Sequence, residues 1–97
     1  MTTYRLTSAA LSELREATLH YERKEPGPGR KFLDEIDDTI DRILRFTRAW
    51  QPLSARTRRC RTHRFPFGIL YQVRSDEILI TAVMDLRRDP RYWRDLI

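Results

Sequence analysis

The chain has 97 residues, of which 40% are hydrophobic and 34% are charged. This composition supports one modest core, so we expect a single domain spanning residues 1–97 rather than two domains or a disordered tail. The sequence contains no apolar run of about 18 residues and no signal-peptide pattern, which predicts a cytoplasmic protein without a membrane segment. We interpret the single cysteine, Cys60, as a small apolar strand residue, because no set of metal-ligand or nucleophile partners accompanies it.

The formal net charge of +5 belongs entirely to the second half of the chain. Residues 1–50 carry nine basic and nine acidic side chains, whereas residues 51–97 carry ten arginines and five carboxylates. This asymmetry indicates an anionic partner, which would be either a nucleic acid or an acidic protein segment. An arginine-rich soluble surface would produce the same asymmetry, so charge alone does not identify a function.

The N-terminal region predicts a short strand and then an amphipathic helix. Residues Tyr4 to Thr7 alternate as a strand. Thr7 or Ser8 can cap the following helix, because a side-chain oxygen there can accept a hydrogen bond from an otherwise unpaired backbone N–H. Apolar residues then recur every three or four positions from Leu11 to Tyr21, with charged residues on the opposite face.

A second amphipathic helix follows the turn sequence PGPG at residues 26–29. Its apolar residues span positions 32–47. Its polar face gathers carboxylates, including Glu35, towards the start and arginines towards the end, as the helix dipole favours. We interpret the acidic run as a solvated face, and we predict neither a metal site nor a cofactor because its spacing matches no metal loop. The two helices should pack as an antiparallel hairpin.

Beyond the second helix the apolar pattern changes from helical spacing to alternation, which is typical of strands. Three strands are predicted at residues 58–65, 67–73 and 78–84, with a turn at Ser75-Asp76, and they should form an antiparallel meander. One face of the last strand is expected to carry Ile78, Ile80, Ala82 and Met84. The predicted fold class is α+β, in the order β-α-α-β-β-β, with the helix hairpin packed on a small antiparallel sheet. A short C-terminal helical turn should start at Pro90.

The face of this sheet that points away from the hairpin should be rich in arginine. It would carry either Arg59 and Arg61 or Arg58 and Arg64, because a register slip of one residue exchanges the two faces of a strand. Arg74 continues the same row on the next strand. The sequence therefore predicts a basic face, or a basic groove at the edge of the sheet.

RNA cleavage by attack of a 2′-hydroxyl is one chemistry that such a surface could perform. It requires a base, an acid and cations that stabilise the phosphate. Tyr71 or Tyr92 could stack a nucleotide base, but His63 and Asp85 are the only obvious acid–base candidates in the basic half. We interpret His63 as an exposed or capped strand histidine, and Asp85 as an ion-pair partner that holds the turn after the last strand. The arginines that could supply the cation are Arg58, Arg61, Arg64, Arg87, Arg88 and Arg91.

The order of elements and several short motifs resemble the RelE/ParE superfamily of bacterial type II toxins, and more closely its ParE-like plasmid-stabilisation branch. The motifs are RFPF at residues 64–67, ILYQV at 69–73, ITAV at 80–83 and RRDPRYW at 87–93. The resemblance covers essentially the whole chain and implies a toxin that a cognate antitoxin holds inactive. Antitoxins of this kind use a flexible acidic segment that folds on binding, which suits the basic second half of the chain.

Two activities share this fold, so the resemblance leaves open whether the protein is an enzyme. ParE-like members inhibit DNA gyrase, whereas RelE-like members cut mRNA in the ribosomal A site. Many relatives have a histidine where this chain has Asp85, and an anionic carboxylate there would repel phosphate unless Arg87 or Arg88 neutralises it. We therefore expect a ParE-like inhibitor of DNA gyrase. The alternatives are a RelE-like ribosome-dependent mRNA endonuclease and an inactive homologue that only binds its antitoxin.

Two sets of site residues follow from this interpretation. If the protein is a nuclease, the phosphate and base would be contacted by Arg61, Arg64, Arg88 and Tyr92. The residues expected to bind the target or the antitoxin are Arg58, Arg61, Arg64, Arg74, Arg87, Arg88, Arg91 and Trp93. In this arrangement Arg87 and Arg88 mark the rim of a basic surface, which Tyr92 and Trp93 brace.

Overall fold

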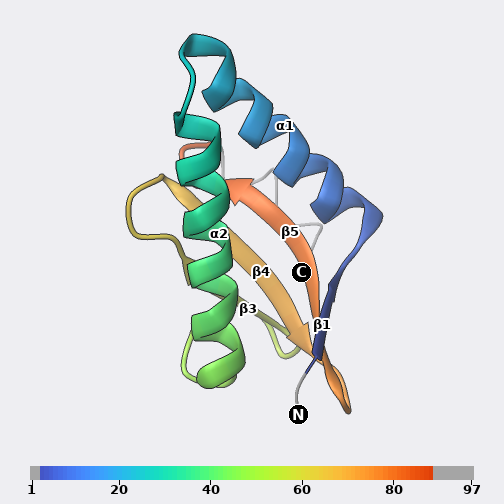
Figure 1. Ribbon diagram of the computed structural model, residues 1–97. Helices are drawn as coiled ribbons and strands as arrows, with labels where there is room; N and C mark the ends of the chain where they lie inside the picture. Colours follow the sequence, from blue (N-terminus) through green and yellow to red (C-terminus); the bar gives the residue numbers. More distant parts are fainter. Residues whose placement is uncertain (1–2, 89–97) are drawn as a thin grey trace.

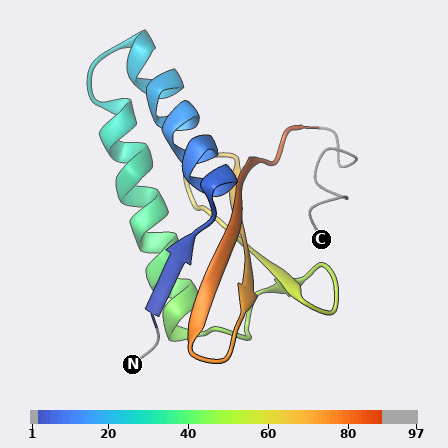
Figure 2. The same cartoon turned by 90° about the vertical axis from the view of Figure 1, so that its right-hand side faces the viewer.

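A helix hairpin covers one face of a five-stranded sheet (Figure 1). The computed structural model describes residues 3–88, and a turned view shows both of its helices on the same side of the sheet (Figure 2). In chain order the elements are β1 (Thr3–Leu6), α1 (Ser8–Lys24), α2 (Pro28–Arg45), β2 (Gln51–Pro52), β3 (Thr57–Arg61), β4 (Phe67–Val73) and β5 (Glu77–Asp85). The α+β class and the helix hairpin predicted from the sequence are confirmed. The turn predicted at Pro90 lies outside the described residues.

Local sequence explains both ends of α1. Thr7 is its N-cap, because the Thr7 Oγ1 atom accepts a hydrogen bond from the Ala10 backbone N–H at 3.1 Å. Beyond the other end of the helix, Gly27 adopts a φ of 112°, which a residue with a Cβ atom rarely tolerates, and Pro28 then opens α2. Glu22 closes this turn, since its carboxylate accepts a hydrogen bond from the Gly27 N–H at 3.1 Å.

The sheet is mixed, with the strand order β1-β5-β4-β3-β2. The antiparallel pairing of β3 with β4 and of β4 with β5 confirms the predicted meander. However, β1 pairs with β5 in parallel, so the expectation of a wholly antiparallel sheet is wrong. Because β5 is parallel to β1, and β4 is antiparallel to both β5 and β3, the strands β3 and β5 both run in the direction of β1. The helix hairpin leads the chain away from the end of β1 and back again (Figure 1). The two-residue strand β2 was too short for alternation to predict.

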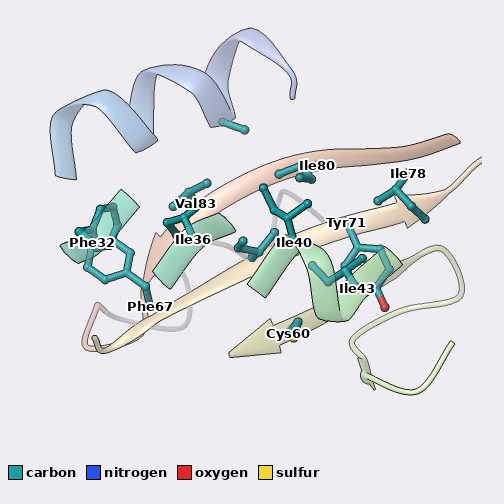
Figure 3. Close-up of a cluster of buried hydrophobic side chains, with 12 residues drawn as sticks. Phe32, Ile36, Ile40, Ile43, Cys60, Phe67, Tyr71, Ile78, Ile80 and Val83 are labelled. Atoms are coloured by element: carbon teal, nitrogen blue, oxygen red, sulfur yellow. The ribbon is translucent and has the colours of Figure 1, made fainter. Parts of the chain in front are cut away.

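The main core lies between α2 and the inner face of the sheet, which is the face towards the helices (Figure 3). Helix α2 contributes a stripe of buried side chains at helical spacing, from Phe32 through Ile36 and Ile40 to Ile43. Opposite this stripe, Cys60 is fully buried, and burial raises the pKa of its thiol. The interpretation of Cys60 as a small apolar strand residue is therefore confirmed.

Tyr71 belongs to this core rather than to a binding surface. Its side chain is fully buried, and its hydroxyl donates a hydrogen bond to the Thr47 carbonyl oxygen at 2.6 Å. Burial raises the pKa of Tyr71 to about 12, and the nearby charge of Arg58 only partly opposes this rise. The prediction that Tyr71 could stack a nucleotide base is wrong, because its ring has no exposed face.

A bulge in β5 divides the side chains of this strand between the two faces of the sheet. Leu70 and Tyr71 of β4 pair with Ala82 and Ile80 respectively, which leaves Thr81 as an extra residue between them. Before the bulge, the even-numbered residues of β5 point into the main core. After it, they join a second, smaller apolar cluster on the outer face. The expectation that all of them share one face is wrong, because the bulge shifts the alternation by one residue.

Candidate functional site

The register of the sheet decides which arginines of β3 face away from the helices. Cys60 packs against α2, so its neighbours Arg59 and Arg61 lie on the outer face and Arg58 lies on the inner face. The stem of Arg59 crosses Gly68 of β4, where an added Cβ atom would lie 3.1 Å from the Arg59 Cδ atom. Burial, and to a smaller extent the charge of Arg61, lowers the pKa of Arg59. Of the two alternatives that the sequence left open, Arg59 and Arg61 are therefore the outward pair.

A buried glutamate holds the turn that follows β3. Glu35 of α2 is only 7% exposed, and its carboxylate accepts hydrogen bonds from the backbone N–H groups of His63 at 3.2 Å and Arg64 at 3.3 Å. Because these N–H groups bind α2 instead of a neighbouring strand, β3 ends at Arg61 and not at Phe65 as predicted. The interpretation of the acidic run as a solvated face is thus wrong for Glu35.

Arg42 links Glu35 to β3. Its Nη2 atom lies 3.9 Å from the Glu35 carboxylate and donates hydrogen bonds to the Thr39 hydroxyl at 2.9 Å and to the Arg61 carbonyl oxygen at 3.2 Å. The guanidinium also lies over the Trp50 ring, 5.7 Å from the ring centroid. These contacts fix the end of β3, and with it the segment that carries Arg61, against α2.

An open cleft of about 560 Å³ lies between α1 and the end of β5. We call it the β5-end cleft and define it by its charged and titratable residues. These are Glu13, Glu16, His20, Tyr21, Arg23, Asp85, Arg87 and Arg88. Among the described lining residues, three carboxylates thus share the cleft with three arginines, and their formal charges cancel.

Asp85 is bound to Arg87 at the rim of the β5-end cleft. Its carboxylate accepts hydrogen bonds from the Arg87 backbone N–H at 2.9 Å, from Nε at 3.0 Å and from Nη2 at 2.7 Å. The hydrogen bonds from the Arg87 side chain, more than any other cause, lower the pKa of Asp85, so the carboxylate stays anionic at neutral pH. The prediction that Asp85 holds the turn after the last strand by an ion pair is confirmed.

Helix α1 supplies the other wall of the β5-end cleft. Glu13 accepts a hydrogen bond from the Val83 backbone N–H at 3.0 Å, which joins α1 to β5. The His20 ring packs edge-on against Tyr21. Burial raises the pKa of Tyr21, and the charge of Arg87 opposes this rise, so the hydroxyl is neutral at physiological pH. Neither Glu13 nor Tyr21 was predicted as a site residue, because the charge asymmetry indicated the second half of the chain.

The predicted site residues separate into two groups at opposite ends of the sheet. The group at the end of β5 consists of Arg61, Arg64, Arg87 and Arg88. The group at the other end, where β3 begins and β4 ends, consists of Arg58 and Arg74. Arg91, Tyr92 and Trp93 lie outside the described residues, so their roles stay predictions. The described arginines that were predicted as site residues thus form two groups and not one continuous rim.

A second, smaller pocket of about 260 Å³ lies where β3 begins and β4 ends. We call it the arginine pocket and define it by Arg48, Arg56, Arg58 and Arg74. The remaining lining residues are Ser54, Ala55, Gln72 and Val73, so no carboxylate is among the described residues around it. Two of its four arginines, Arg48 and Arg56, come from the loops on either side of β2 and were not predicted as site residues.

Within residues 3–88, no group of three or more histidine, cysteine or carboxylate side chains is placed to hold a metal ion. Over the same range, neither helix combines the length and the apolar character needed to cross a bilayer.

Comparisons with known proteins agree with this architecture. The family described as the ParE toxin of the type II toxin-antitoxin system parDE matches residues 4–90. Among solved structures, a chain of the chromosomal ParDE toxin-antitoxin system from P. aeruginosa has a similar fold, with a TM-score of 0.67. The two chains are 18% identical, and the match covers 90% of this chain and 98% of that one. No curated protein is significantly similar in sequence. The resemblance to the ParE branch of the RelE/ParE superfamily is confirmed, and the chain belongs to the ParE toxin family.

Proposed function

We propose that this chain is the toxin of a type II toxin-antitoxin module and that it inhibits DNA gyrase in the cytoplasm. Membership of the ParE family supports the first part of the proposal. The chemistry of the β5-end cleft supports a mechanism without hydrolysis. An RNA-cleaving enzyme on the same fold would need an acid, a base and uncompensated cations around the scissile phosphate.

The pairing of Arg87 with Asp85 is the observation that carries this choice. Two side-chain hydrogen bonds of 3.0 and 2.7 Å bind one edge of the guanidinium, through Nε and Nη2, to the Asp85 carboxylate. Because the same bonds lower the pKa of Asp85, its carboxylate cannot serve as a general acid at neutral pH. Arg87, which follows the last strand, is thus bound to the protein's own carboxylate.

His63, the other acid–base candidate, is not among the residues that line the β5-end cleft. It lies in the turn after β3, where its backbone N–H binds Glu35 and its side chain is exposed. A phosphate in the cleft would also meet the negative charges of Glu13, Glu16 and Asp85. The described residues therefore favour inhibition of gyrase through surface contacts over cleavage of RNA.

We further propose that a cognate antitoxin neutralises the toxin with a flexible segment that carries acidic and apolar side chains. Its acidic residues would face Arg61, Arg64 and Arg88, which are exposed at the β5 end of the sheet. Its apolar residues would pack against Leu19, which is 55% exposed at the edge of the β5-end cleft. Such a segment would order itself only when it binds.

Induction of the chain alone in bacteria tests the choice of target, with DNA synthesis and protein synthesis followed separately by labelled precursors. The expected result is an early stop in DNA synthesis, accompanied by a DNA-damage response. An early stop in translation with cut mRNA would overturn gyrase as the target in favour of the ribosome-dependent nuclease. Unaffected growth would identify an inactive homologue, whose remaining role would be to bind its antitoxin.

A further inference from the structure

We propose that the arginine pocket is a docking site for the phosphates of a duplex nucleic-acid backbone. Four arginines line a pocket of about 260 Å³, and no carboxylate is among its described lining residues. Such binding would be separate from gyrase inhibition and would not depend on it. The arginine pocket lies at the end of the sheet opposite to the β5-end cleft, and its binding can be measured without gyrase.

Arg58, on β3, and Arg74, directly after β4, have neutral hydrogen-bond partners. Elsewhere in the described chain, ion pairs with carboxylates are made by Arg5, Arg30, Arg42, Arg45 and Arg87. In the pocket, Arg58 Nη1 donates to the Trp50 carbonyl oxygen at 2.8 Å, and Arg74 Nη2 donates to the Gln72 amide oxygen at 2.7 Å. The Gln72 amide in turn donates to the Thr57 hydroxyl at 3.3 Å. These bonds orient the guanidinium groups without cancelling their charge, which is therefore available to an anion.

Hydrogen bonds hold the loops that carry the other two arginines, Arg48 and Arg56. The buried Tyr71 hydroxyl donates to the Thr47 carbonyl oxygen at 2.6 Å and so fixes the residue next to Arg48. Ser54 Oγ accepts a hydrogen bond from the Arg56 backbone N–H at 3.3 Å, which shapes the loop before β3. A site whose backbone is held before the ligand arrives loses less conformational entropy on binding.

The lining of the pocket favours a duplex phosphate backbone over other anionic partners. Guanidinium groups bind phosphate oxygens through paired N–H donors, and a phosphodiester backbone presents successive charges to successive arginines. The described lining contains no aromatic ring on which an unpaired base could stack, which favours a duplex over a single strand. Its apolar members are only Ala55 and Val73, so an acidic protein segment would find little surface on which to bury an apolar anchor.

The test compares two double variants of the full chain that lose the same amount of positive charge. Arg48→Gln with Arg56→Gln removes two loop cations from the pocket. Arg15→Gln with Arg30→Gln removes two exposed cations from the helices, outside the pocket lining. Binding of a short, fluorescently labelled DNA duplex is measured by anisotropy over a series of salt concentrations, and the unfolding midpoint of each variant shows whether it is folded.

We expect the pocket variant to bind the duplex at least about tenfold more weakly than the helix variant in low salt. The slope of log Kd against log salt concentration should also fall by about 2, because each phosphate contact contributes about 0.9 to it. Equal binding by the two variants would overturn the proposal, since affinity would then follow net charge alone. Ala55→Glu, which introduces a carboxylate among the four arginines, is the second variant and should abolish duplex binding. Unchanged binding by this variant would overturn the proposal as well.

Two competitors decide the class of ligand. Poly-glutamate and a single strand of the same DNA sequence are each titrated against the labelled duplex bound to the unmodified chain. The expected result is weak displacement by both. If poly-glutamate displaces the duplex at an equal concentration of charge, the pocket serves an acidic protein segment and the proposal fails. Tighter binding of the single strand would overturn the assignment to a duplex.

Discussion

The two ends of the sheet carry the same kind of side chain in opposite electrostatic settings. At the end of β5, Arg87 is bound to Asp85, and three carboxylates offset three arginines in the described lining of one cleft. At the other end, four arginines share a pocket with no carboxylate among its described lining. A count of arginines along the sequence therefore does not locate an anion-binding surface, because the fold decides which carboxylate reaches which arginine.

The two ends also differ in how their turns are held. Near the β5 end, the turn after β3 is held by the buried charge of Glu35. At the arginine pocket, the loop after α2 is held by the neutral hydroxyl of Tyr71. Breaking the contacts of a buried charge costs more free energy than breaking a neutral hydrogen bond. Substitutions at the two ends should therefore lower the free energy of unfolding by different amounts.

Substitution of Glu35 by alanine should have the largest effect, a loss of about 3 kcal/mol in the free energy of unfolding. It leaves the N–H groups of His63 and Arg64 without this acceptor and removes the carboxylate partner of the half-buried Arg42. Chemical denaturation measures the loss. Asp38→Ala, on the exposed face of the same helix, is the control and should change stability by less than about 0.5 kcal/mol. An equally small effect for Glu35→Ala would contradict its role in the turn.

Tyr71→Phe should cost about 1 kcal/mol, because it removes one hydroxyl and leaves the Thr47 carbonyl oxygen without this donor. The ring stays in place, so the change reports the loop anchor at the arginine pocket and not the core. Thermal or chemical unfolding gives the value. Tyr4→Phe, at a residue that is 44% exposed, is the matched control and should be neutral. Equal stability of the two variants would show that the hydrogen bond from Tyr71 to Thr47 does not stabilise the fold.

Arg88→Ala should leave the unfolding midpoint almost unchanged, because the side chain is exposed, and yet lower toxicity. Growth after induction measures toxicity, with protein levels checked in parallel. Arg15→Ala removes an exposed arginine from α1, away from the cleft lining, and should stay fully toxic. Full toxicity of Arg88→Ala at a normal protein level would show that the β5 end is not part of the surface that binds the target.

The smallest expected effect concerns the pH dependence of Asp85. Because hydrogen bonds from Arg87 lower its pKa, the folded state gains stability at neutral pH that is lost as the pH falls through the pKa of the folded carboxyl group. Arg87→Gln should raise the pKa of Asp85 towards its ordinary value and reduce this acid-range loss. An NMR titration of the Asp85 carboxyl carbon measures the shift directly. The same pKa in both proteins would show that Arg87 does not control it.

Much of the fold could be predicted from the sequence, because helical and alternating patterns depend on residues that are close in the chain. The buried stripe from Phe32 to Ile43 and the strand position of Cys60 are examples. The parallel pairing of β1 with β5 depends instead on the path of the whole helix hairpin. The bulge at Thr81 has no local signal, although it reassigns the second half of β5 to the other face of the sheet.

The candidate site was less predictable, because side chains from separate elements build it. Glu35 did carry a signal, since it falls between Phe32 and Thr39 at helical spacing and so lies on the buried stripe. Its place in an acidic run concealed that signal. Arg48 and Arg56 lie in loops without periodicity, so only the folded chain shows that they meet at one pocket.

Supercoiling of relaxed plasmid DNA by purified gyrase tests the proposed target most directly. With ATP present and the purified chain added in increasing amounts, we predict that supercoiling is lost and that cleaved plasmid accumulates. Undiminished supercoiling at every concentration of the chain, together with cleavage of ribosome-bound mRNA by the same preparation, would contradict gyrase inhibition.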